Sequence, residues 1–172
     1  MSRTEHHPVL LHGFTGSSAS WDARLVDGLA GAGLTPVMVD LPGQGAEAGL
    51  TDPSHFTLES ALARIGAAGF WPADLVGYSM GGRIALHFAA AFPERVRRLV
   101  LESASPGLGT EAERAERRVA DAALAARLVS EGMEWFVEHW EAQPLFEPRS
   151  RLDPAIRARE RELRMRNDPR SL

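Results

Sequence analysis

The chain has 172 residues, enough for one domain with a buried core, and its 44% hydrophobic and 24% charged residues are typical of a globular protein. The net charge of -4 argues against binding to nucleic acid, and the absence of cysteine excludes disulfides and thiolate metal sites. No apolar run is long enough to span a bilayer and residues 1–7 lack the apolar core of a signal peptide, so we expect no membrane association and a cytoplasmic location.

Short apolar runs alternate with helical patterns over the first hundred residues. Buried strands are predicted at 8–11, 36–40, 73–78 and 96–102. Helices are predicted from the serine-rich run 17–20 through Leu29, at 58–68 and at 82–92. The strands are continuous apolar runs rather than alternating ones. This pattern predicts an α/β fold in which a mostly parallel sheet is buried on both faces by helices.

The character of the sequence changes after the fourth predicted strand. Residues 111–129 are charged and rich in alanine, and residues 133–140 form a second helical pattern that contains two tryptophans. A third helix is predicted to run to about Arg166, with Asp153 as its N-cap and Pro154 in its first turn. These three patterns predict an all-helical insertion.

The order of these elements predicts two domains. We expect the N-terminal part of an α/β core at 1–105 and a helical cap at 106–172. No strand pattern follows the cap, so the sheet is expected to lack its last strands and the strand at 96–102 to have a free edge. An unpaired edge and an incomplete core predict poor solubility and low activity for the isolated chain.

A glycine-rich turn follows the third predicted strand. Residues 77–81 read Gly-Tyr-Ser-Met-Gly, the pattern G-x-S-x-G. A strand, this turn and then a helix are the context of a nucleophile elbow, in which glycines flank the serine where a Cβ would clash. The pattern predicts a catalytic Ser79, with the backbone N–H of Met80 facing a developing oxyanion. The alternative is an ordinary serine in a strand-to-helix turn.

Two further loops follow predicted strands. The loop His12-Gly13-Phe14-Thr15-Gly16 is a second source of oxyanion donors, and the Phe14 N–H is the candidate. We interpret His12 itself as a structural residue that braces this loop. We interpret residues 40–43, Asp-Leu-Pro-Gly, as a turn that redirects the chain.

The order of the three motifs, H-G-F, D-L-P-G and G-Y-S-M-G-G, resembles that of the α/β-hydrolase proteins from residue 8 onward. The chain is more narrowly similar to the 2-succinyl-6-hydroxy-2,4-cyclohexadiene-1-carboxylate synthases of menaquinone biosynthesis, hereafter the synthase family. The segments that carry this similarity extend over nearly the whole chain and lie at 11–17, 77–83, 102–108, 113–118, 140–146 and 166–169.

The resemblance implies a reaction and a set of residues. The synthase family catalyses a 2,5-elimination, in which a base removes a proton from a cyclohexene ring that carries several carboxylates and pyruvate leaves. A Ser-His-Asp triad is implied, with Ser79 as its serine, together with a small anionic polycarboxylate substrate and neither metal nor organic cofactor. Arginine forks bind carboxylates bidentately and stay charged. The positions that match the substrate pocket are Tyr78, Arg83, Arg117, Trp140 and Arg164, with Arg166 as the competitor of Arg164.

Each matched position also has a purely structural interpretation. Arg117 is spaced to pair with Glu113 along one helix face. Arg164 belongs to a stretch rich in arginine and glutamate that is typical of an exposed face. Trp140 fits the core of the helical cap, and Tyr78 fits simple packing.

The synthase family places its triad aspartate and histidine after further strands, which would lie beyond Leu172. Of the histidines present, His55, His87 and His139 lack the context of a triad base. Three other functions remain open on the sequence: an ester or C–C bond hydrolase of the same fold, an inactive fragment, and a binding module that uses its arginine-rich helices. The sequence makes no prediction of the oligomeric state.

Overall fold

A computed structural model, which describes residues 7–172, contains a four-stranded parallel sheet. The strands lie in the order β2-β1-β3-β4. Leu10 lies opposite both Met38 and Val76, so the central strand β1 pairs with its two neighbours in register. Because all pairs are parallel, the carboxyl ends of the strands meet at one edge. The strands span Val9–Leu11 (β1), Val37–Val39 (β2), Ala73–Tyr78 (β3) and Val96–Glu102 (β4).

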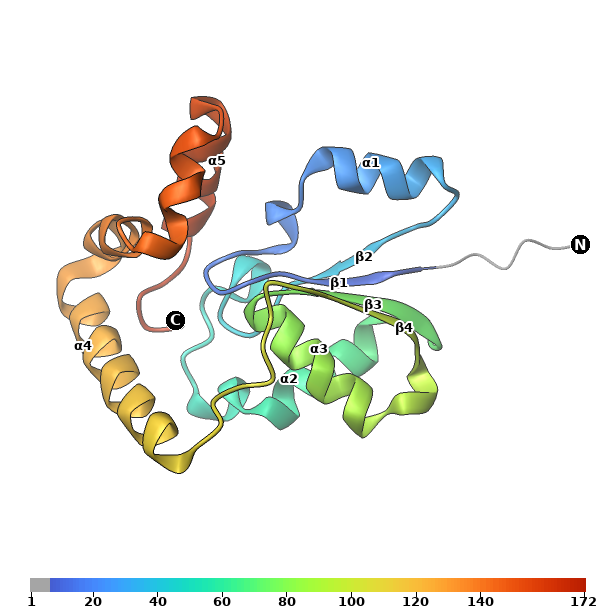
Figure 1. Cartoon of the computed structure of the whole chain (residues 1–172), viewed down its shortest axis with the longest axis horizontal. Helices are drawn as coiled ribbons and strands as arrows, with labels where there is room; N and C mark the ends of the chain where they lie inside the picture. Colours follow the sequence, from blue (N-terminus) through green and yellow to red (C-terminus); the bar gives the residue numbers. More distant parts are fainter. Residues whose placement is uncertain (1–6) are drawn as a thin grey trace, which may run out of the picture.

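Three helices flank the sheet. Helix α1 (Ala23–Gly31) lies on one face, whereas α2 (Leu58–Ala68) and α3 (Met80–Ala91) lie on the other (Figure 1). The predicted start of α1 in the serine run was wrong, because the side chain of Asp22 caps the helix by accepting from the N–H of Arg24. Helix α3 begins two residues earlier than predicted, directly after Ser79.

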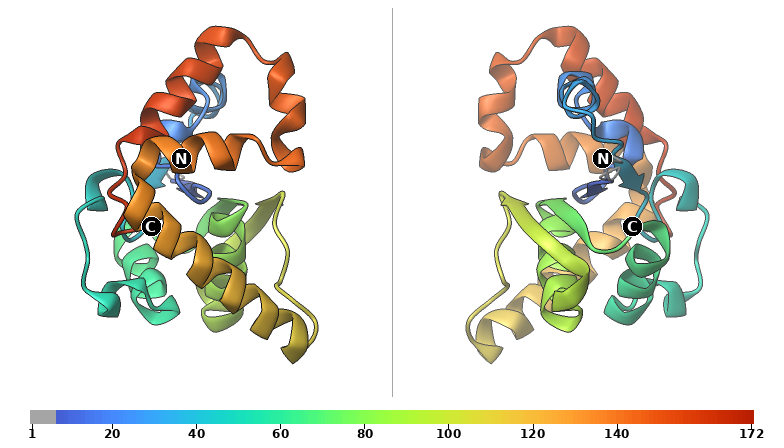
Figure 2. Two further views of the ribbon diagram at one scale, coloured as in Figure 1. Left: turned by 90° about the vertical axis from the view of Figure 1, so that its left-hand side faces the viewer. Right: turned by 90° about the vertical axis from the view of Figure 1, so that its right-hand side faces the viewer.

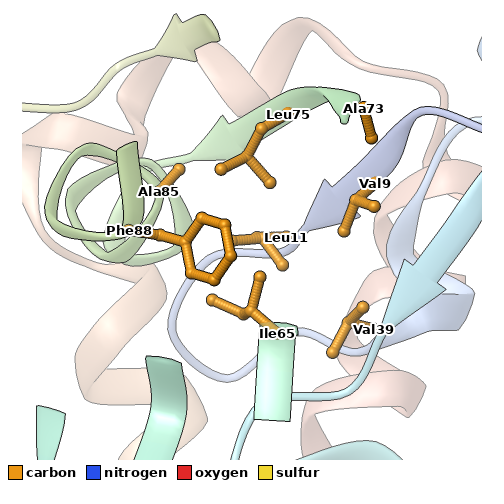
Figure 3. Close-up of a cluster of buried hydrophobic side chains, with 8 residues drawn as sticks. All are labelled: Val9, Leu11, Val39, Ile65, Ala73, Leu75, Ala85 and Phe88. Carbon is orange, nitrogen blue, oxygen red and sulfur yellow. The ribbon is translucent and has the colours of Figure 1, made fainter. Parts of the chain in front are cut away.

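The main hydrophobic core lies between the sheet and the helices α2 and α3. Side chains at alternate positions of β1 and β3 point toward Ile65 of α2 and toward Phe88 of α3 (Figure 3). All of them are buried, and the period of two along the strands explains which residues contribute. The cluster consists of Val9, Leu11, Val39, Ile65, Ala73, Leu75, Ala85 and Phe88.

The opposite face of the sheet and the β4 edge are less well covered. Helix α1 has no buried residue, and on β4 the side chains of Val100 and Leu101 are 51% and 41% exposed. The predicted burial of every strand on both faces is therefore wrong for β4 and for β2, whose Met38 is 37% exposed, although it holds for β1, whose three residues are buried. The free edge predicted for the fourth strand is confirmed, since within residues 7–172 β4 pairs only with β3.

Helices also form the rest of the chain. Helix α4 (Glu111–Glu141) is interrupted at Gly132, where φ is 84° and ψ is 179°, so the two helical patterns predicted there are confirmed. Helix α5 (Pro154–Met165) begins as predicted, with the side chain of Asp153 accepting from the N–H of Ala155. Between them, residues Pro144–Arg151 form a 3-10 helix that the sequence analysis did not predict. Both α-helices lie beyond the carboxyl ends of the strands (Figure 1).

The helical segments have a small core of their own. Leu128, Met133, Phe136 and Val137 of α4 are buried together, and Phe14 from the loop after β1 packs against them. Figure 2 shows α4 running across the end of the sheet at which this loop lies. The cap is thus anchored on the loop that the sequence predicts to carry an oxyanion donor. Across residues 7–172, no helix combines the length and apolarity that crossing a bilayer needs.

Candidate active site

Ser79 occupies a strained turn between β3 and α3. Its φ of 54° and ψ of -114° are in a region that residues with a side chain rarely adopt. The turn is held at both ends, because the Ser79 N–H donates to the carbonyl of Glu102 at 2.9 Å and its carbonyl accepts from the N–H of Arg83 at 3.1 Å. Such a conformation costs about 1–3 kcal/mol and persists only where the surroundings enforce it.

Glycines around Ser79 allow the backbone segments to touch. A Cβ on Gly81 would lie 2.3 Å from the carbonyl oxygen of Leu11 and 2.4 Å from that of His12. A Cβ on Gly77 would lie 2.5 Å from the Cα of Gly82. The first turn of α3 therefore packs directly on the end of β1, as only glycine permits.

This close packing brings the loop after β1 against Ser79. A Cβ on Gly13 would lie 2.9 Å from the ring of Tyr78 and 3.3 Å from the Cβ of Ser79. The next residue is Phe14, and Met80 follows Ser79 at the start of α3. The two predicted oxyanion donors thus belong to the two segments that flank the serine, and the backbone dipoles at the start of α3 favour a negative charge there.

His12 braces the base of that loop. Its Nδ1 is 2.8 Å from the carbonyl oxygen of Gly13, and its Nε2 accepts from the N–H of Leu41 at 3.1 Å. This arrangement assigns the proton to Nδ1 and leaves a neutral ring. Burial lowers the pKa of His12, while the Gly13 hydrogen bond and the Asp40 carboxylate oppose the shift. The interpretation of His12 as a structural residue is confirmed.

Asp40 fixes the turn after β2. Burial raises the pKa of Asp40, but hydrogen bonds from the N–H groups of Ala46 and Ser18 outweigh it, so the pKa is lowered overall. The two N–H groups lie 3.0 Å and 2.5 Å from the carboxylate oxygens. Gly43 has a φ of 80°, in agreement with the predicted turn. The carboxylate oxygens of Asp40 are thus used to hold the backbone of two loops.

We expect the free energy of unfolding to fall as the pH is lowered from about 7 to 5. Burial lowers the pKa of His12 in the folded chain. The unfolded chain, with an ordinary histidine pKa near ~6.5, therefore binds the extra proton first, and stability falls by up to about 1.4 kcal/mol per pH unit. Urea unfolding across this range measures the slope. His12→Gln should flatten this slope. Equal slopes for His12→Gln and the parent chain would contradict the expectation.

Trp140 belongs to an aromatic cluster that joins the cap to the loop after β1. Its ring lies 5.3 Å from that of Phe14 in an edge-to-face arrangement and 5.6 Å from that of Phe136 in a stacked one. The Phe146 ring is 5.7 Å away on the other side. Trp140 is thus partly buried and packs against the core of the helical cap.

The first two predicted arginines are exposed. Arg83 lies one turn after Ser79 on α3. Arg117 lies on the first half of α4 and donates to the carboxylate of Asp121 at 2.7 Å. The partner considered from the sequence, Glu113, instead accepts from Thr110 at the start of the helix. An exposed pair of this kind contributes well under about 1 kcal/mol, so a stronger anionic ligand can displace Asp121.

The structure distinguishes Arg164 from Arg166. The Arg164 side chain is only 12% exposed and donates to the carboxylate of Glu141 at 2.7 Å. Arg166 is largely exposed and pairs with Glu162 one turn away on its own helix. Arg164 is therefore the more enclosed of the two side chains, whereas the Arg166 side chain is 67% exposed.

Arg149 is an enclosed arginine that the sequence analysis missed. It lies in the 3-10 helix Pro144–Arg151, pairs with Glu160 and sits 5.7 Å above the Phe146 ring. Burial lowers its pKa, and repulsion from Arg164 adds to this effect, while Glu141 and Tyr78 oppose it. The residues that act on its charge thus include Tyr78, which precedes Ser79 in the sequence. The segment around Arg149 has no periodic pattern that would have predicted this.

None of His12, His55, His87 and His139 hydrogen-bonds to the Ser79 hydroxyl. Both nitrogens of His12 are engaged, His139 stacks on Trp135 with the ring centres 5.1 Å apart, and His87 is exposed on α3. Residues 7–172 contain no cluster of three or more histidine or acidic side chains suited to a metal ion. The described residues around Ser79 are thus a serine in a strained turn and two flanking backbone segments, and Arg149 and Arg164 are partly enclosed farther along the chain.

A family model described as the alpha/beta hydrolase fold matches residues 9–172. A Bacillus subtilis (strain 168) protein, provisionally named a 2-succinyl-6-hydroxy-2,4-cyclohexadiene-1-carboxylate synthase, is 43% identical over 167 residues, which are 93% of this chain and 59% of the relative. A Klebsiella pneumoniae protein of that name is 34% identical over 95% of this chain and 63% of its own length. The structure of MenH from S. aureus is 31% identical, with a TM-score of 0.86 over 98% of this chain and 64% of that chain.

The chain thus spans about three-fifths of the length of the relatives it matches. The predicted fold is confirmed by the parallel sheet with its flanking helices and by these matches. Since the family model matches nearly every residue from β1 to the end of the sequence, the chain belongs to the α/β-hydrolase fold family.

Proposed function

We propose that this chain supplies the core and cap of a 2-succinyl-6-hydroxy-2,4-cyclohexadiene-1-carboxylate synthase. This carbon–oxygen lyase eliminates pyruvate from 2-succinyl-5-enolpyruvyl-6-hydroxy-3-cyclohexene-1-carboxylate. The observation that carries the proposal is the similarity to relatives of that name over more than nine-tenths of the chain, at 43% identity for the Bacillus subtilis protein. We take residues 1–105 as the core and 106–172 as the cap, and we propose a cytoplasmic location.

In this proposal the strained turn at Ser79 is a nucleophile elbow. Ser79 is the serine of a Ser-His-Asp triad, and the N–H groups of Phe14 and Met80 form the oxyanion hole. The triad base removes a ring proton, and the bond from the ring carbon to the enolpyruvyl oxygen breaks. The enolpyruvate that leaves takes up a proton at its methylene carbon and becomes pyruvate. Backbone donors in place before the reaction stabilise the negative charge that develops, without the cost of reorienting solvent.

The arginines explain why a substrate with several carboxylates suits this site. Arg164 and Arg149 are enclosed by the cap, and the pKa of Arg149 is lowered by burial and by its like-charged neighbour. An anionic ligand would relieve that repulsion and form bidentate hydrogen bonds. We propose that Arg83 and Arg117 bind further carboxylates, that Arg117 exchanges Asp121 for substrate, and that Tyr78 and Trp140 line the pocket.

We further propose that the histidine and aspartate of the triad come from polypeptide outside residues 7–172. His12 is hydrogen-bonded to the N–H of Leu41, and His139 stacks on Trp135. The chain covers only 59% of the length of the Bacillus subtilis relative. An incomplete triad predicts slow turnover by residues 1–172 alone, because removing a triad member costs several orders of magnitude in rate.

The test compares two activities in two polypeptides. Pyruvate release, coupled to lactate dehydrogenase, and cleavage of a p-nitrophenyl ester are measured for the 172-residue chain. They are then measured for the same chain joined to the part of the Bacillus subtilis relative that it does not cover. We expect pyruvate release by the joined polypeptide at a rate at least about a thousandfold above the short chain, and little ester cleavage.

Each other outcome contradicts the proposal in a distinct way. Ester cleavage without pyruvate release would favour a hydrolase of the same fold. Absence of both activities from a joined polypeptide that folds would favour an inactive chain. Rapid pyruvate release by the short chain would show that residues 1–172 contain their own base.

A further inference from the structure

The last residues of the chain connect the cap to two loops of the core. Asn167 follows α5 and is only 6% exposed. Its side-chain amide donates to the carbonyl of Thr15 at 3.0 Å and to the carbonyl of Arg164 at 2.9 Å. Both amide hydrogens are therefore used, one on the loop after β1 and the other on the last turn of α5.

A second hydrogen bond runs parallel to the first. Ser171 is 3% exposed, and its hydroxyl lies 2.9 Å from the carbonyl of Gly43 in the turn after β2. The segment between them is itself folded, because the N–H of Ser171 donates to the carbonyl of Asp168 at 3.0 Å. Residues 167–171 thus form a short clamp, with one contact on each of the two loops at the carboxyl ends of β1 and β2.

The carbonyl that Asn167 holds belongs to a residue in a strained conformation. Thr15 has a φ of 65°, which a β-branched residue rarely adopts, and it is 1% exposed. It lies between Phe14 and Gly16, and the N–H of Gly16 closes the loop on the carbonyl of Gly13 at 3.0 Å. A backbone conformation of this kind needs external contacts to persist, and Asn167 supplies one from 152 residues away.

We propose that Asn167 is a positioning residue. Its side-chain amide holds the loop that carries the Phe14 N–H against the C-terminal end of helix α5. Correct docking of the cap and correct orientation of this oxyanion donor then depend on the same side-chain amide. This proposal rests on the proposed function, because only there does the Phe14 N–H act as an oxyanion donor beside Ser79. The restraint on the loop itself does not depend on any reaction.

The restraint is tested by amide hydrogen exchange in the 172-residue chain. Asn167→Asp keeps the shape of the side chain but removes its N–H donors and places a carboxylate against two carbonyls. We expect the amide of Gly16, which donates to the carbonyl of Gly13 within this loop, to exchange about tenfold faster in this variant, the effect of losing roughly 1.4 kcal/mol of a buried hydrogen bond. The β3 amides should exchange as in the parent chain.

Matched variants separate hydrogen bonding from packing. Asn167→Ala removes both, so equal acceleration in Asn167→Ala and Asn167→Asp assigns the effect to the lost donor. Ser171→Ala removes the hydroxyl that contacts the carbonyls of Gly43 and Asp168. It should speed exchange of the Gln44 amide while leaving the Gly16 amide unchanged. Faster exchange of the Gly16 amide only in Asn167→Ala would assign a packing role, and unchanged exchange in both Asn167 variants would overturn the proposal.

A second readout addresses catalysis. In the joined polypeptide of the pyruvate assay, Asn167→Asp should lower kcat about tenfold with KM unchanged, because the oxyanion donor acts on the transition state. A raised KM at constant kcat would overturn the positioning role. If the joined polypeptide releases no pyruvate, the proposed function fails, while the exchange experiment still decides whether Asn167 holds the loop.

Discussion

Replacing Gly81 with alanine is expected to lower the free energy of unfolding by about 4 kcal/mol or more, enough to unfold a marginally stable chain. The added Cβ would lie 2.3 Å and 2.4 Å from the carbonyl oxygens of Leu11 and His12. Both are backbone atoms of the central strand and the loop after it, so no side chain can rotate to make room. Either α3 or β1 must move, and the turn at Ser79 between them would lose its geometry.

Gly28→Ala is the matched control. Gly28 lies within α1, and a Cβ there would meet nothing within 4 Å. Alanine at that position should raise the free energy of unfolding by about 0.5–1 kcal/mol, because glycine loses more conformational freedom in a helix. Urea unfolding of the two variants beside the parent chain gives both values. A Gly81→Ala variant as stable as the parent would show that the contact between α3 and β1 is looser than the structure has it.

The elements that were predicted correctly are those encoded by neighbouring residues. The apolar runs located all four strands, and the pattern around Asp153 and Pro154 located the start of α5. The start of α1 was missed because a distant residue decides it. The N–H of Ser18 donates to the carboxylate of Asp40 at 2.5 Å, which holds the serine run in a separate turn, and Asp22 becomes the cap.

The exposure of β4 was also beyond the reach of a local pattern. Apolar residues on both sides of a strand indicate that both of its faces favour burial. Whether each face is buried depends on which helices pack against it. Val100 lies on the face that carries only α1, and the edge of β4 has no partner within residues 7–172. The unpaired edge itself was predicted, because residues 106–172 contain no strand pattern.

The candidate site divides in the same way. Ser79, Phe14 and Met80 follow from short motifs whose glycines have local reasons, and the structure places all three on segments in contact. Arg149 and Asn167 were missed because their positions depend on how the cap folds back over the core. A hydrogen bond between residues 152 positions apart leaves no periodic signal in either segment.

The most informative pair of variants is at Ser79 itself. Ser79→Gly is expected to raise the free energy of unfolding by about 1 kcal/mol, because the φ of 54° and ψ of -114° cost a residue with a side chain about 1–3 kcal/mol and glycine's greater freedom when unfolded takes back part of that gain. Ser79→Ala should change stability by less than about 0.5 kcal/mol, since the serine side chain makes no capping hydrogen bond and alanine keeps the same strain.

Both variants should lower pyruvate release by the joined polypeptide about a thousandfold or more, because each removes the hydroxyl that the proposed triad uses. Urea unfolding and the coupled pyruvate assay on the same preparations measure the two quantities together. If the strain at Ser79 serves catalysis, Ser79→Gly should be more stable than the parent chain and inactive. This is the result expected where activity requires a destabilised conformation. A glycine variant no more stable than the alanine variant would contradict the strain, and one that retains turnover would remove Ser79 from the mechanism.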